Sequence, residues 1–375
     1  MRVVHLIKVK GVAGAENHLL LLLAGLRGQG IDAHLHYLVN PSQPVPEFMD
    51  AAKALDIPVT RGVIRSHFSP GIVRQLAREL APLKPDIVHT HLLHADLYGA
   101  LAGRFMRVNG RRPRVLSSRH NDDQFRYRAP IRLLNRALWR IIDHGIAISE
   151  AVRRFSIDTE GARPERIRTI LYGYQPNVGD PEAARREARA SLGLPADAIV
   201  VGAVCRLIEQ KGLRYGLEAF ARASTDFPAA RLLIVGDGPL RHALEGQAKS
   251  LGLGERIAFL GWRADAAALM PAFDIFLMPS LWEGFGLVLL EAMAASVPVV
   301  GSRVSAIPEV VLEGETGLLA PPRDVDALAG HLRGLLGDAP LRRHMGMMGR
   351  ERLETQFSMG GMVAATAALY REALA

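Results

Sequence analysis

At 375 residues the chain is longer than one ordinary hydrophobic core supports, so two domains are expected. Nearly half of the residues are apolar and 22% are charged, which is the composition of a globular protein. The apolar runs fall short of the roughly 18 residues that a membrane-spanning helix needs, and the one cysteine, Cys205, excludes an internal disulfide.

The net charge of +8 is concentrated in the first half of the chain. Residues 1–180 carry 26 Lys and Arg against 16 Asp and Glu, and residues 181–375 carry 20 against 22. The basic half could bind an anionic membrane surface, an acidic acceptor or nucleic acid. An arginine-rich proteome would also explain its charge. Nucleic acid is least favoured, because the basic half lacks interleaved aromatic residues. Without a signal-peptide pattern, we expect a cytoplasmic protein, with peripheral contact at the inner membrane face if the basic half meets lipid.

The chain opens with an apolar strand at residues 2–9, a glycine-containing turn at Gly14 and an amphipathic helix. A strand, a glycine turn and a helix start resemble the opening of a nucleotide-binding fold, although a lone glycine turn is weak evidence. Strands and helices then alternate through the first half, near residues 32–39, 46–55, 59, 70–83, 86–91 and 96–108. This rhythm predicts a parallel sheet with helices on both faces, whose ligands bind beyond the carboxyl ends of the strands.

Three histidines, His89, His91 and His120, fall near predicted strand ends. A metal site is disfavoured, because no clustered cysteines or carboxylates accompany them. His120 is the one favoured as functional, since its loop, RHNDD, is polar. His91 and Asp96 are weaker candidates for contact with an acceptor.

The segment 129–144, APIRLLNRALWRIIDH, predicts an amphipathic helix. Arg132, Arg136 and Arg140 form one stripe, and apolar residues form another. A helix packed on the sheet with a solvated basic face explains this pattern and is preferred. A surface for anionic lipid headgroups or an acidic lipid-linked acceptor is the alternative.

The second half begins after a turn-rich linker at residues 177–180 and repeats the strand-helix pattern. Arg206 ends a predicted strand and Lys211 precedes a helix, so two cations should lie near one point that suits a diphosphate. A surface pairing of both with Glu209 is the alternative. Gly236 begins a tight glycine turn before the next helix.

Residues 279–300, PSLWEGFGLVLLEAMAASVPVV, predict a loop, a helix opened by glycine and a buried strand. The backbone amides of Phe285, Gly286 and Leu287 could receive an anion at the helix N-terminus. Glu283 in the loop and Glu291 in the helix could accept hydrogen bonds from hydroxyl groups on either side of that anion. Two glutamates at this spacing would be equally compatible with ordinary surface charge.

The stretch EGFGLVLLEAMAASVPVV resembles, nearly letter for letter, the signature of the GT4 (glycosyl transferase group 1) family of nucleotide-sugar-dependent glycosyltransferases. Three further segments resemble the family's GGAE, GRLxxxKG and GxGP patterns: GAE at 14–16, CRLIEQKG at 205–212 and GDGP at 236–239. The chain departs from the family's glycines at five positions: Ala13, Cys205, Ser296, Ser305 and Ala306.

The resemblance implies a GT-B architecture, in which two Rossmann-like domains face each other across a central cleft. Residues 1–176 would form the acceptor-binding domain, residues 177–357 the donor-binding domain, and a final helix at 358–375 would cross back to the first. The reaction would move a sugar, with retention of anomeric configuration, from a nucleoside-diphosphate sugar to a glycan or lipid-linked acceptor, in surface polysaccharide or glycolipid synthesis.

The resemblance also implies roles for individual residues. Arg206 and Lys211 would bind the departing diphosphate, Glu283 the donor sugar and Glu291 the ribose. Gly14 and His120 would approach the donor from the other domain, Gly236 would face the nucleotide, and Trp262 and Arg263 would meet its base. The cations and helix amides would stabilise the leaving group, so no metal or other cofactor is expected. Two alternatives stay open: a sugar-nucleotide epimerase on the same fold, and a catalytically silent sugar-nucleotide-binding scaffold.

Overall fold

The computed structural model describes the chain except residues 10, 12–13, 43–44, 65–69, 123 and 177–178. Ala13 and the start of the expected linker, residues 177–178, lie outside the described residues. The chain divides into two compact units, Met1–Gly173 with Met359–Ala375 and Tyr174–Ser358. The division thus falls after Gly173 rather than after residue 176, and the final helix belongs to the first unit.

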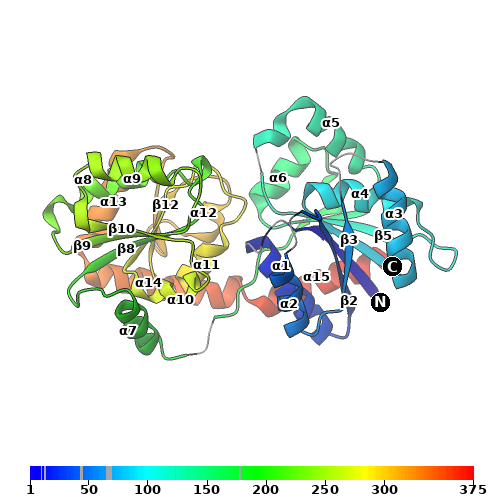
Figure 1. Cartoon of the computed structure of the whole chain (residues 1–375), viewed down its shortest axis with the longest axis horizontal. Coiled ribbons are helices and arrows are strands. Elements are labelled where there is room, and N and C mark those ends of the chain that lie inside the picture. Colours follow the sequence, from blue (N-terminus) through cyan, green and yellow to red (C-terminus); the bar gives the residue numbers. More distant parts are fainter. Residues whose placement is uncertain (10, 12–13, 43–44, 65–69, 123, 177–178) are drawn as a thin grey trace. The chain divides into compact units, whose positions relative to one another are not determined.

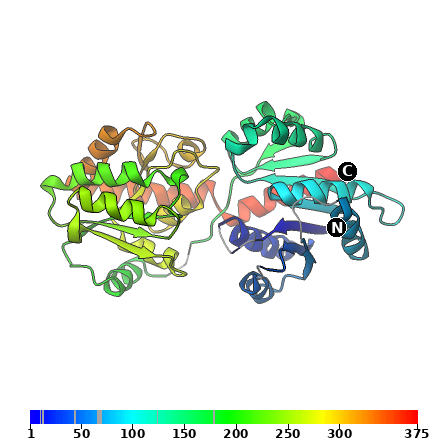
Figure 2. The ribbon, with the colours of Figure 1, turned by 45° about the horizontal axis from the view of Figure 1, so that its top comes forward.

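The first unit contains a parallel sheet with helices on both faces (Figures 1 and 2). Its described strands, in spatial order, are β3 (Val59–Val63), β2 (Asp32–Val39), β1 (Arg2–Lys8), β4 (Ile87–His91), β5 (Arg114–Arg119), β6 (His144–Ala147) and β7 (Ile167–Thr169). Its described helices are α1 (Gly14–Gly28), α2 (Pro46–Ala54), α3 (Pro70–Leu80), α4 (Leu92–Phe105), α5 (Ala129–Leu138), α6 (Glu150–Asp158) and α15 (Met359–Leu374).

The two faces of β1 have different partners because side chains alternate along a strand. Leu6 belongs to an apolar cluster with residues of α3 and α4. Its neighbour His5 points the other way and contacts Tyr370 of α15. The final helix therefore packs on the first sheet, and its Val363 also contacts α1 at Gly25.

The second unit repeats this architecture. Its described strands, in spatial order, are β10 (Ile257–Gly261), β9 (Ala230–Val235), β8 (Ile199–Val204), β11 (Ile275–Met278), β12 (Val299–Ser302) and β13 (Gly317–Ala320). Its described helices are α7 (Pro181–Ser191), α8 (Leu213–Ala223), α9 (Arg241–Ser250), α10 (Ala266–Leu269), α11 (Leu287–Ala294), α12 (Ile307–Val310), α13 (Val325–Gly337) and α14 (Ala339–Gln356). Figure 2 shows α8 and α9 side by side over one face of the sheet.

Both sheets are doubly wound, as the alternating pattern predicts. All strand pairs within the named strands are parallel. The strand order reverses between β1 and β4 in the first unit and between β8 and β11 in the second. Ligands of such sheets bind beyond the carboxyl ends of the strands at these reversals. The cleft expected between the two units stays a prediction.

The helix predicted over residues 129–144 is wrong at its C-terminal end, because α5 ends at Leu138. Trp139, the residue after it, is buried, and its ring lies over Gly145, where an added Cβ would come within 2.4 Å of it. The chain must turn there, because the Asp143 amide already bonds to Val115 and β6 follows. Arg140 therefore lies outside the helix.

Two of the positions where GT4 proteins have glycine are strained in this chain. Ser296 (φ 56°) and Ser305 (φ 45°) both adopt left-handed backbone conformations. This region costs a residue with a Cβ on the order of 1 kcal/mol or more. At both positions a glycine would adopt the left-handed conformation without this strain, whereas this chain adopts it with serine.

We expect Ser296→Gly to raise the free energy of unfolding by about 0.5–1 kcal/mol, since relief of strain exceeds the entropy that glycine adds to the unfolded chain. Ser296 is exposed, so little packing is lost. Thermal unfolding would measure an increase of a few degrees in the Tm of the second unit. An unchanged or lower Tm would show that the serine side chain offsets its strain.

Candidate active site

The candidate site of the second unit lies at the reversal between β8 and β11. Arg206 follows β8, Lys211 lies in the short 3₁₀ helix η4 (Glu209–Lys211), and Glu283 lies in the loop after β11. Gly212 brings these two loops together: its φ is 59°, and an added Cβ would lie 2.0 Å from the Pro279 carbonyl oxygen. The two loops therefore contact each other through backbone atoms.

Lys211 and Glu283 form an ion pair, and both side chains are largely buried. The sequence predicted separate partners for them, a diphosphate and a sugar, and did not predict this pairing. Arg206, in contrast, is exposed, and its side chain has no ion pair with any described residue. The predicted alternative, in which Glu209 pairs with both cations, is absent among the described ion pairs. The site thus holds one neutralised cation and one exposed cation.

Helix α11 begins as the sequence predicted, with Gly286 as its N-cap residue at a φ of 83°. Phe285 is buried, and its ring meets the edge of Phe357 with 5.9 Å between centroids. Phe285 can therefore offer a ligand only its backbone. The first amides of this helix, including that of Leu287, carry the partial positive charge that favours an anion.

Glu291, in α11, lines a cavity of about 580 Å³ together with residues of α7, α10 and α14. Burial raises the pKa of its carboxyl group to about 7. At neutral pH the group is therefore divided between its protonated and ionised forms, and only the ionised form accepts hydrogen bonds through both oxygens. A ligand that donates hydroxyl groups to Glu291 would favour ionisation.

The turn that begins at Gly236 packs against the residues after β8. At Gly236 the φ is 130°, and an added Cβ would lie 1.9 Å from the Cys205 carbonyl oxygen. Trp262, after β10, is 73% exposed, so it does not pack in the core. Arg263 is paired with Asp265 at 2.6 Å, which restricts its availability to a base.

In the first unit, Gly14 is the exposed first residue of α1, and His120 follows β5. Both ring nitrogens of His120 have partners: Nε2 lies 3.1 Å from Nδ1 of His91, and Nδ1 bonds to the Tyr172 hydroxyl. Burial, with the charges of Arg126 and Arg119, lowers the pKa of His120 to about 3. The imidazole is therefore neutral, and a ring nitrogen must give up its bond before it can bind a substrate.

The weaker acceptor candidates of the sequence, His91 and Asp96, are wholly inside the first unit. Asp96 accepts hydrogen bonds from Thr90, Ser117 and Arg119, at 2.6, 2.6 and 2.7 Å. A carboxylate with three buried donors serves the structure. Asp96 has no exposed surface, so the expectation that it contacts an acceptor is wrong.

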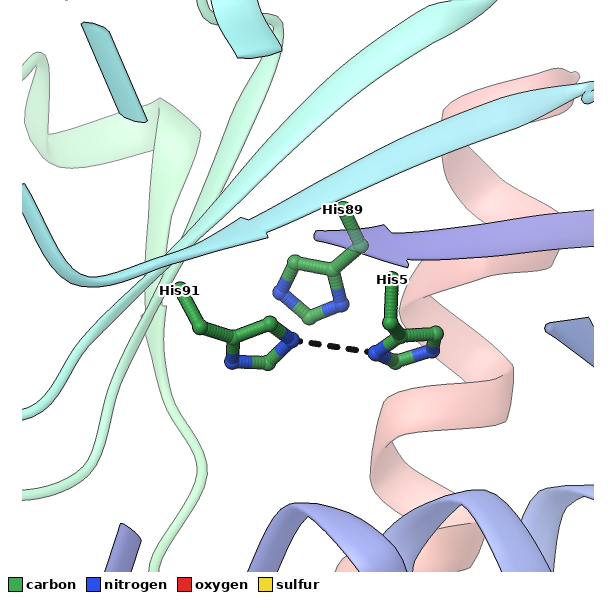
Figure 3. Close-up of side chains that lie close together, drawn as sticks. All are labelled: His5, His89 and His91. Carbon is green, nitrogen blue, oxygen red and sulfur yellow. Dashed lines mark hydrogen bonds between the residues drawn. The ribbon is translucent and has the colours of Figure 1, made fainter. Parts of the chain in front are cut away.

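The sequence reasoning missed a set of polar groups that surround the three predicted histidines. His5, Tyr172 and Tyr370 are buried and bond to His91, His120 and His89, respectively. His5, drawn beside His89 and His91 in Figure 3, was detectable, because a histidine in the middle of the apolar run at residues 3–7 needs a buried partner. No sequence pattern indicated that Tyr370 of the last helix would contact this histidine.

Comparison with known proteins relates each unit to a family model. Residues 12–177 match glycosyltransferase family 4, and residues 184–352 match glycosyl transferases group 1. The chain is 31% identical over 343 residues to the phosphatidyl-myo-inositol mannosyltransferase of Mycobacterium leprae, which covers 90% of this chain and 87% of that protein. The chain belongs to the group 1 glycosyltransferases.

Other proteins similar to this glycosyltransferase carry different names. The N-acetyl-alpha-D-glucosaminyl L-malate synthase of Bacillus anthracis is 29% identical over 77% of this chain and 75% of its own length. Among solved structures, HepE of Anabaena in complex with UDP and glucose has a TM-score of 0.87 at 24% identity, over 99% of this chain and 100% of its own. WaaG, a glycosyltransferase involved in lipopolysaccharide biosynthesis, has a TM-score of 0.73 at 18% identity, over 98% and 99%.

These similarities establish the fold of the glycosyltransferase as GT-B and confirm the enzyme class expected from the sequence. The positions of Arg206, Lys211, Glu283 and the start of α11 at one strand reversal agree with that class. Among the described residues, no helix has the length and apolar content to cross a membrane.

Proposed function

We propose that this enzyme transfers a sugar from a nucleoside-diphosphate sugar to an acceptor hydroxyl in glycolipid or surface polysaccharide synthesis, with retention of anomeric configuration. One observation carries the donor assignment: an exposed cation, a buried cation and a helix N-terminus converge on the β8–β11 reversal. This combination suits a diphosphate. The names of the relatives, which include a mannosyltransferase acting on phosphatidylinositol, support the acceptor class.

In the proposed reaction, the bond between the anomeric carbon and the diphosphate breaks, and negative charge develops on the departing oxygen. Arg206, Lys211 and the amides at the start of α11 stabilise that charge. The acceptor oxygen attacks on the same face, and its proton passes to the departing phosphate. These cations take the place of a divalent metal, so the proposed reaction needs no metal. Glu283 holds hydroxyl groups of the donor sugar, and Glu291 holds those of the ribose.

The test is a thermal-shift panel of nucleoside diphosphates and their sugars, each with and without EDTA, beginning with UDP and UDP-glucose. A ligand that binds only the folded state raises the Tm by mass action. We expect one nucleotide family to raise the Tm equally in both conditions, and the matching sugar donor to be consumed only when an acceptor is added. A shift abolished by EDTA would contradict the metal-free site.

The same panel separates the two alternatives. Conversion of the donor into another sugar nucleotide without an acceptor would identify an epimerase. Binding without any turnover, across lipid and glycan acceptors, would identify a silent scaffold. The sequence carries Arg206, Lys211, Glu283 and Glu291 together, which favours the catalytic interpretation, because a silent subunit has no reason to retain all four.

Glu291→Gln tests the ribose contact through pH. Because the carboxyl pKa is raised to about 7, the wild-type enzyme should gain affinity for a nucleoside-diphosphate sugar by about tenfold between pH 6 and pH 8 as Glu291 ionises. The diphosphate of such a donor does not titrate in this range. Calorimetry should find this rise in the wild type and a flat profile in Glu291→Gln. An equal rise in affinity in both proteins would show that Glu291 does not contact the ligand.

We also propose that the enzyme meets anionic lipid through the segment η2 (Gln124–Tyr127) and α5. Three large apolar side chains are exposed there, at 41%, 58% and 62%, namely Phe125, Tyr127 and Leu133. Exposed arginines accompany them: Arg128, Arg132 and Arg136. Apolar anchors beside cations suit the headgroup region of an anionic bilayer.

Vesicle sedimentation tests this surface. The wild-type enzyme should bind vesicles containing phosphatidylglycerol and release them at high salt, and Leu133→Asp should bind several-fold less. Met347→Asp is the control, because Met347 is equally exposed, at 60%, but lies in the second unit. Equal binding by the two variants would contradict the proposed surface.

A further inference from the structure

The short helix η2 buries the residue that hydrophobic burial alone would leave outside. It contains Phe125, Arg126 and Tyr127 in succession. The two aromatic residues are 41% and 58% exposed, whereas Arg126 is 2% exposed. Aromatic side chains gain free energy when they are buried, and arginine is almost never fully buried unless it is paired. An interaction other than hydrophobic burial therefore decides which side of η2 faces the interior.

The geometry of η2 makes the three side chains alternatives for the interior. A 3₁₀ helix has three residues per turn, so consecutive side chains point in directions about 120° apart. When Arg126 points inward, Phe125 and Tyr127 must point elsewhere. The ring of Tyr127 lies against that of Phe155 of α6, with 5.1 Å between centroids at 76°, and more than half of Tyr127 stays exposed. Rotating η2 to bury Phe125 would turn Arg126 out of the interior.

Glu160 is the partner that holds Arg126 inside. Nη1 of Arg126 donates a hydrogen bond to Oε1 of Glu160 at 2.7 Å, and the two side chains are 3% and 0% exposed. Glu160 follows the end of α6 and precedes Gly161, whose φ of 79° belongs to the tight turn there. The two partners are 34 positions apart, so the pair attaches η2 to a different part of the chain.

This ion pair is the outer end of a buried row of four charges with alternating sign. Oε2 of Glu160 lies 3.5 Å from Nε of Arg119, and Nη1 of Arg119 donates to Asp96 at 2.7 Å. None of the four side chains is more than 3% exposed. Two cations and two carboxylates leave the row neutral, which lowers the electrostatic penalty of burying them. The row connects η2 to β5 and α4.

Such a row selects an arrangement more than it adds stability. Apolar residues can often replace a buried ion pair without loss of stability, but removing one partner leaves an unpaired buried charge, which is strongly unfavourable. If η2 rotated to bury Phe125 or Tyr127, Glu160 would lose its closest cation. The charges therefore disfavour the arrangement that hydrophobic burial would select.

The turn that contains Glu160 also contacts α5. A Cβ added at Gly161 would lie 2.9 Å from Cγ of Arg136, so the stem of this arginine packs on the turn. Arg128, directly after η2, and Leu133 of α5 are exposed. One turn thus contacts both elements that carry the exposed apolar and basic side chains.

We propose that the Arg126–Glu160 ion pair positions Phe125 and Tyr127 outward, so that η2 and α5 present a preformed apolar and basic surface to an anionic lipid bilayer. Arg126 is buried and does not itself contact lipid. A surface that is already ordered binds more tightly than one that must first be ordered. The lipid contact rests on the proposed function, whereas the direction of η2 does not.

Modification of arginines by phenylglyoxal, mapped by mass spectrometry in the full-length enzyme, tests the direction of η2. In the wild type, the exposed Arg128 should react, and Arg119 and Arg126 should be protected. Glu160→Leu removes the partner and keeps an apolar interior, so Arg126 should turn outward and react at least tenfold faster. Arg119 should stay protected through Asp96. Unchanged protection of Arg126 would overturn the proposal, and so would an equal increase at Arg119, which would mean that the unit had unfolded.

Asp158→Asn is the matched control. Asp158 is exposed at the end of α6, two positions before Glu160, so this variant loses the same charge without touching η2. Arg126 should stay protected in it. Glu160→Gln keeps the test decisive if Glu160→Leu does not fold, because it retains the size of the side chain and removes its charge. Arg126 should then react several-fold faster than in the wild type, and equal protection would show that charge does not hold it.

Sedimentation with phosphatidylglycerol vesicles tests the lipid contact. Glu160→Leu and Asp158→Asn both make the enzyme more positive by one charge, so electrostatic attraction alone would strengthen the binding of both to the same degree. We expect Glu160→Leu to bind several-fold less than Asp158→Asn, because its aromatic side chains are no longer held outward. Equal binding of the two variants would contradict the role of the ion pair in the lipid contact.

Nucleotide binding separates this inference from the proposed transfer reaction. The second unit carries the proposed nucleotide site, so the Tm increase caused by a nucleoside diphosphate should be the same in Glu160→Leu and the wild type. A smaller increase would mean that Glu160 acts beyond η2 and would contradict the proposal. If no nucleotide raises the Tm of the wild type, the proposed function fails while the arginine modification result stands by itself. If the wild type binds no vesicles, the lipid contact fails and the direction of η2 still stands.

Discussion

Replacing Lys211 with alanine is expected to lower kcat for glycosyl transfer by about 10²–10³-fold, the usual effect of removing one group that stabilises a developing negative charge. Lys211 lies at the β8–β11 reversal, and its ammonium group is mostly buried, so water cannot replace it easily. Initial rates with the donor identified by the thermal-shift panel would measure the loss. A decrease of less than about fivefold would contradict its assignment to the diphosphate.

The ion pair with Glu283 complicates that experiment, because Lys211→Ala also leaves a largely buried carboxylate without its partner. A double-mutant cycle separates the two effects. If Lys211 acts on the diphosphate, Lys211→Ala should still weaken binding of the nucleoside diphosphate in a Glu283→Ala background. If the lysine serves only to neutralise Glu283, the second substitution should have no additional effect on that binding. A Tm for each variant shows whether loss of folding contributes.

The sequence predicted the second unit more completely than the first, and the reason is local. Glu283, Gly286 and Glu291 belong to one loop and one helix, so their relative positions follow from backbone geometry within a short segment. The strand-helix rhythm also predicted both parallel sheets, because few arrangements bury such a pattern. Gly286 at the N-cap of α11 is the clearest confirmed element.

Contacts between distant segments were not predictable in the same way. Lys211 and Glu283 are 72 positions apart, and Tyr370 and His5 are 365 apart. The residues around each of these side chains do not indicate its distant partner. The order of the strands in the sheet decides which strand ends lie next to each other. The alternation of His89 and His91 does place them on one face of a strand, so part of the buried cluster that they form with His5 was predictable from the sequence.

Replacing Gly236 with alanine should destabilise the second unit by about 3 kcal/mol or more and lower its Tm on the order of 10 °C. The φ of 130° suits only glycine, and the new Cβ would lie 1.9 Å from the Cys205 carbonyl oxygen. That obstacle is backbone, so no change of side-chain rotamer relieves it. Calorimetry or circular dichroism during heating would measure the shift.

Gly246→Ala is the matched control, since it makes the same chemical change in the same unit. Gly246 lies within α9, and an added Cβ there would meet nothing within 4 Å. Alanine should stabilise a helix interior by about 0.5–1 kcal/mol, so the two variants should shift the Tm in opposite directions. Equal decreases would mean that the backbone at Gly236 is not the cause.

The same two variants test whether the turn at Gly236 affects binding of the diphosphate. The Leu207 amide bonds to the Asp237 carbonyl at 2.9 Å, and the Cys205 amide to Val235 at 3.0 Å, so the turn holds the residues on both sides of Arg206. A shifted turn should therefore displace Arg206 and weaken diphosphate binding even at temperatures where Gly236→Ala is folded. Gly246→Ala should bind the nucleotide like the wild-type enzyme. Unchanged binding in Gly236→Ala at such temperatures would mean that the position of Arg206 does not depend on this turn.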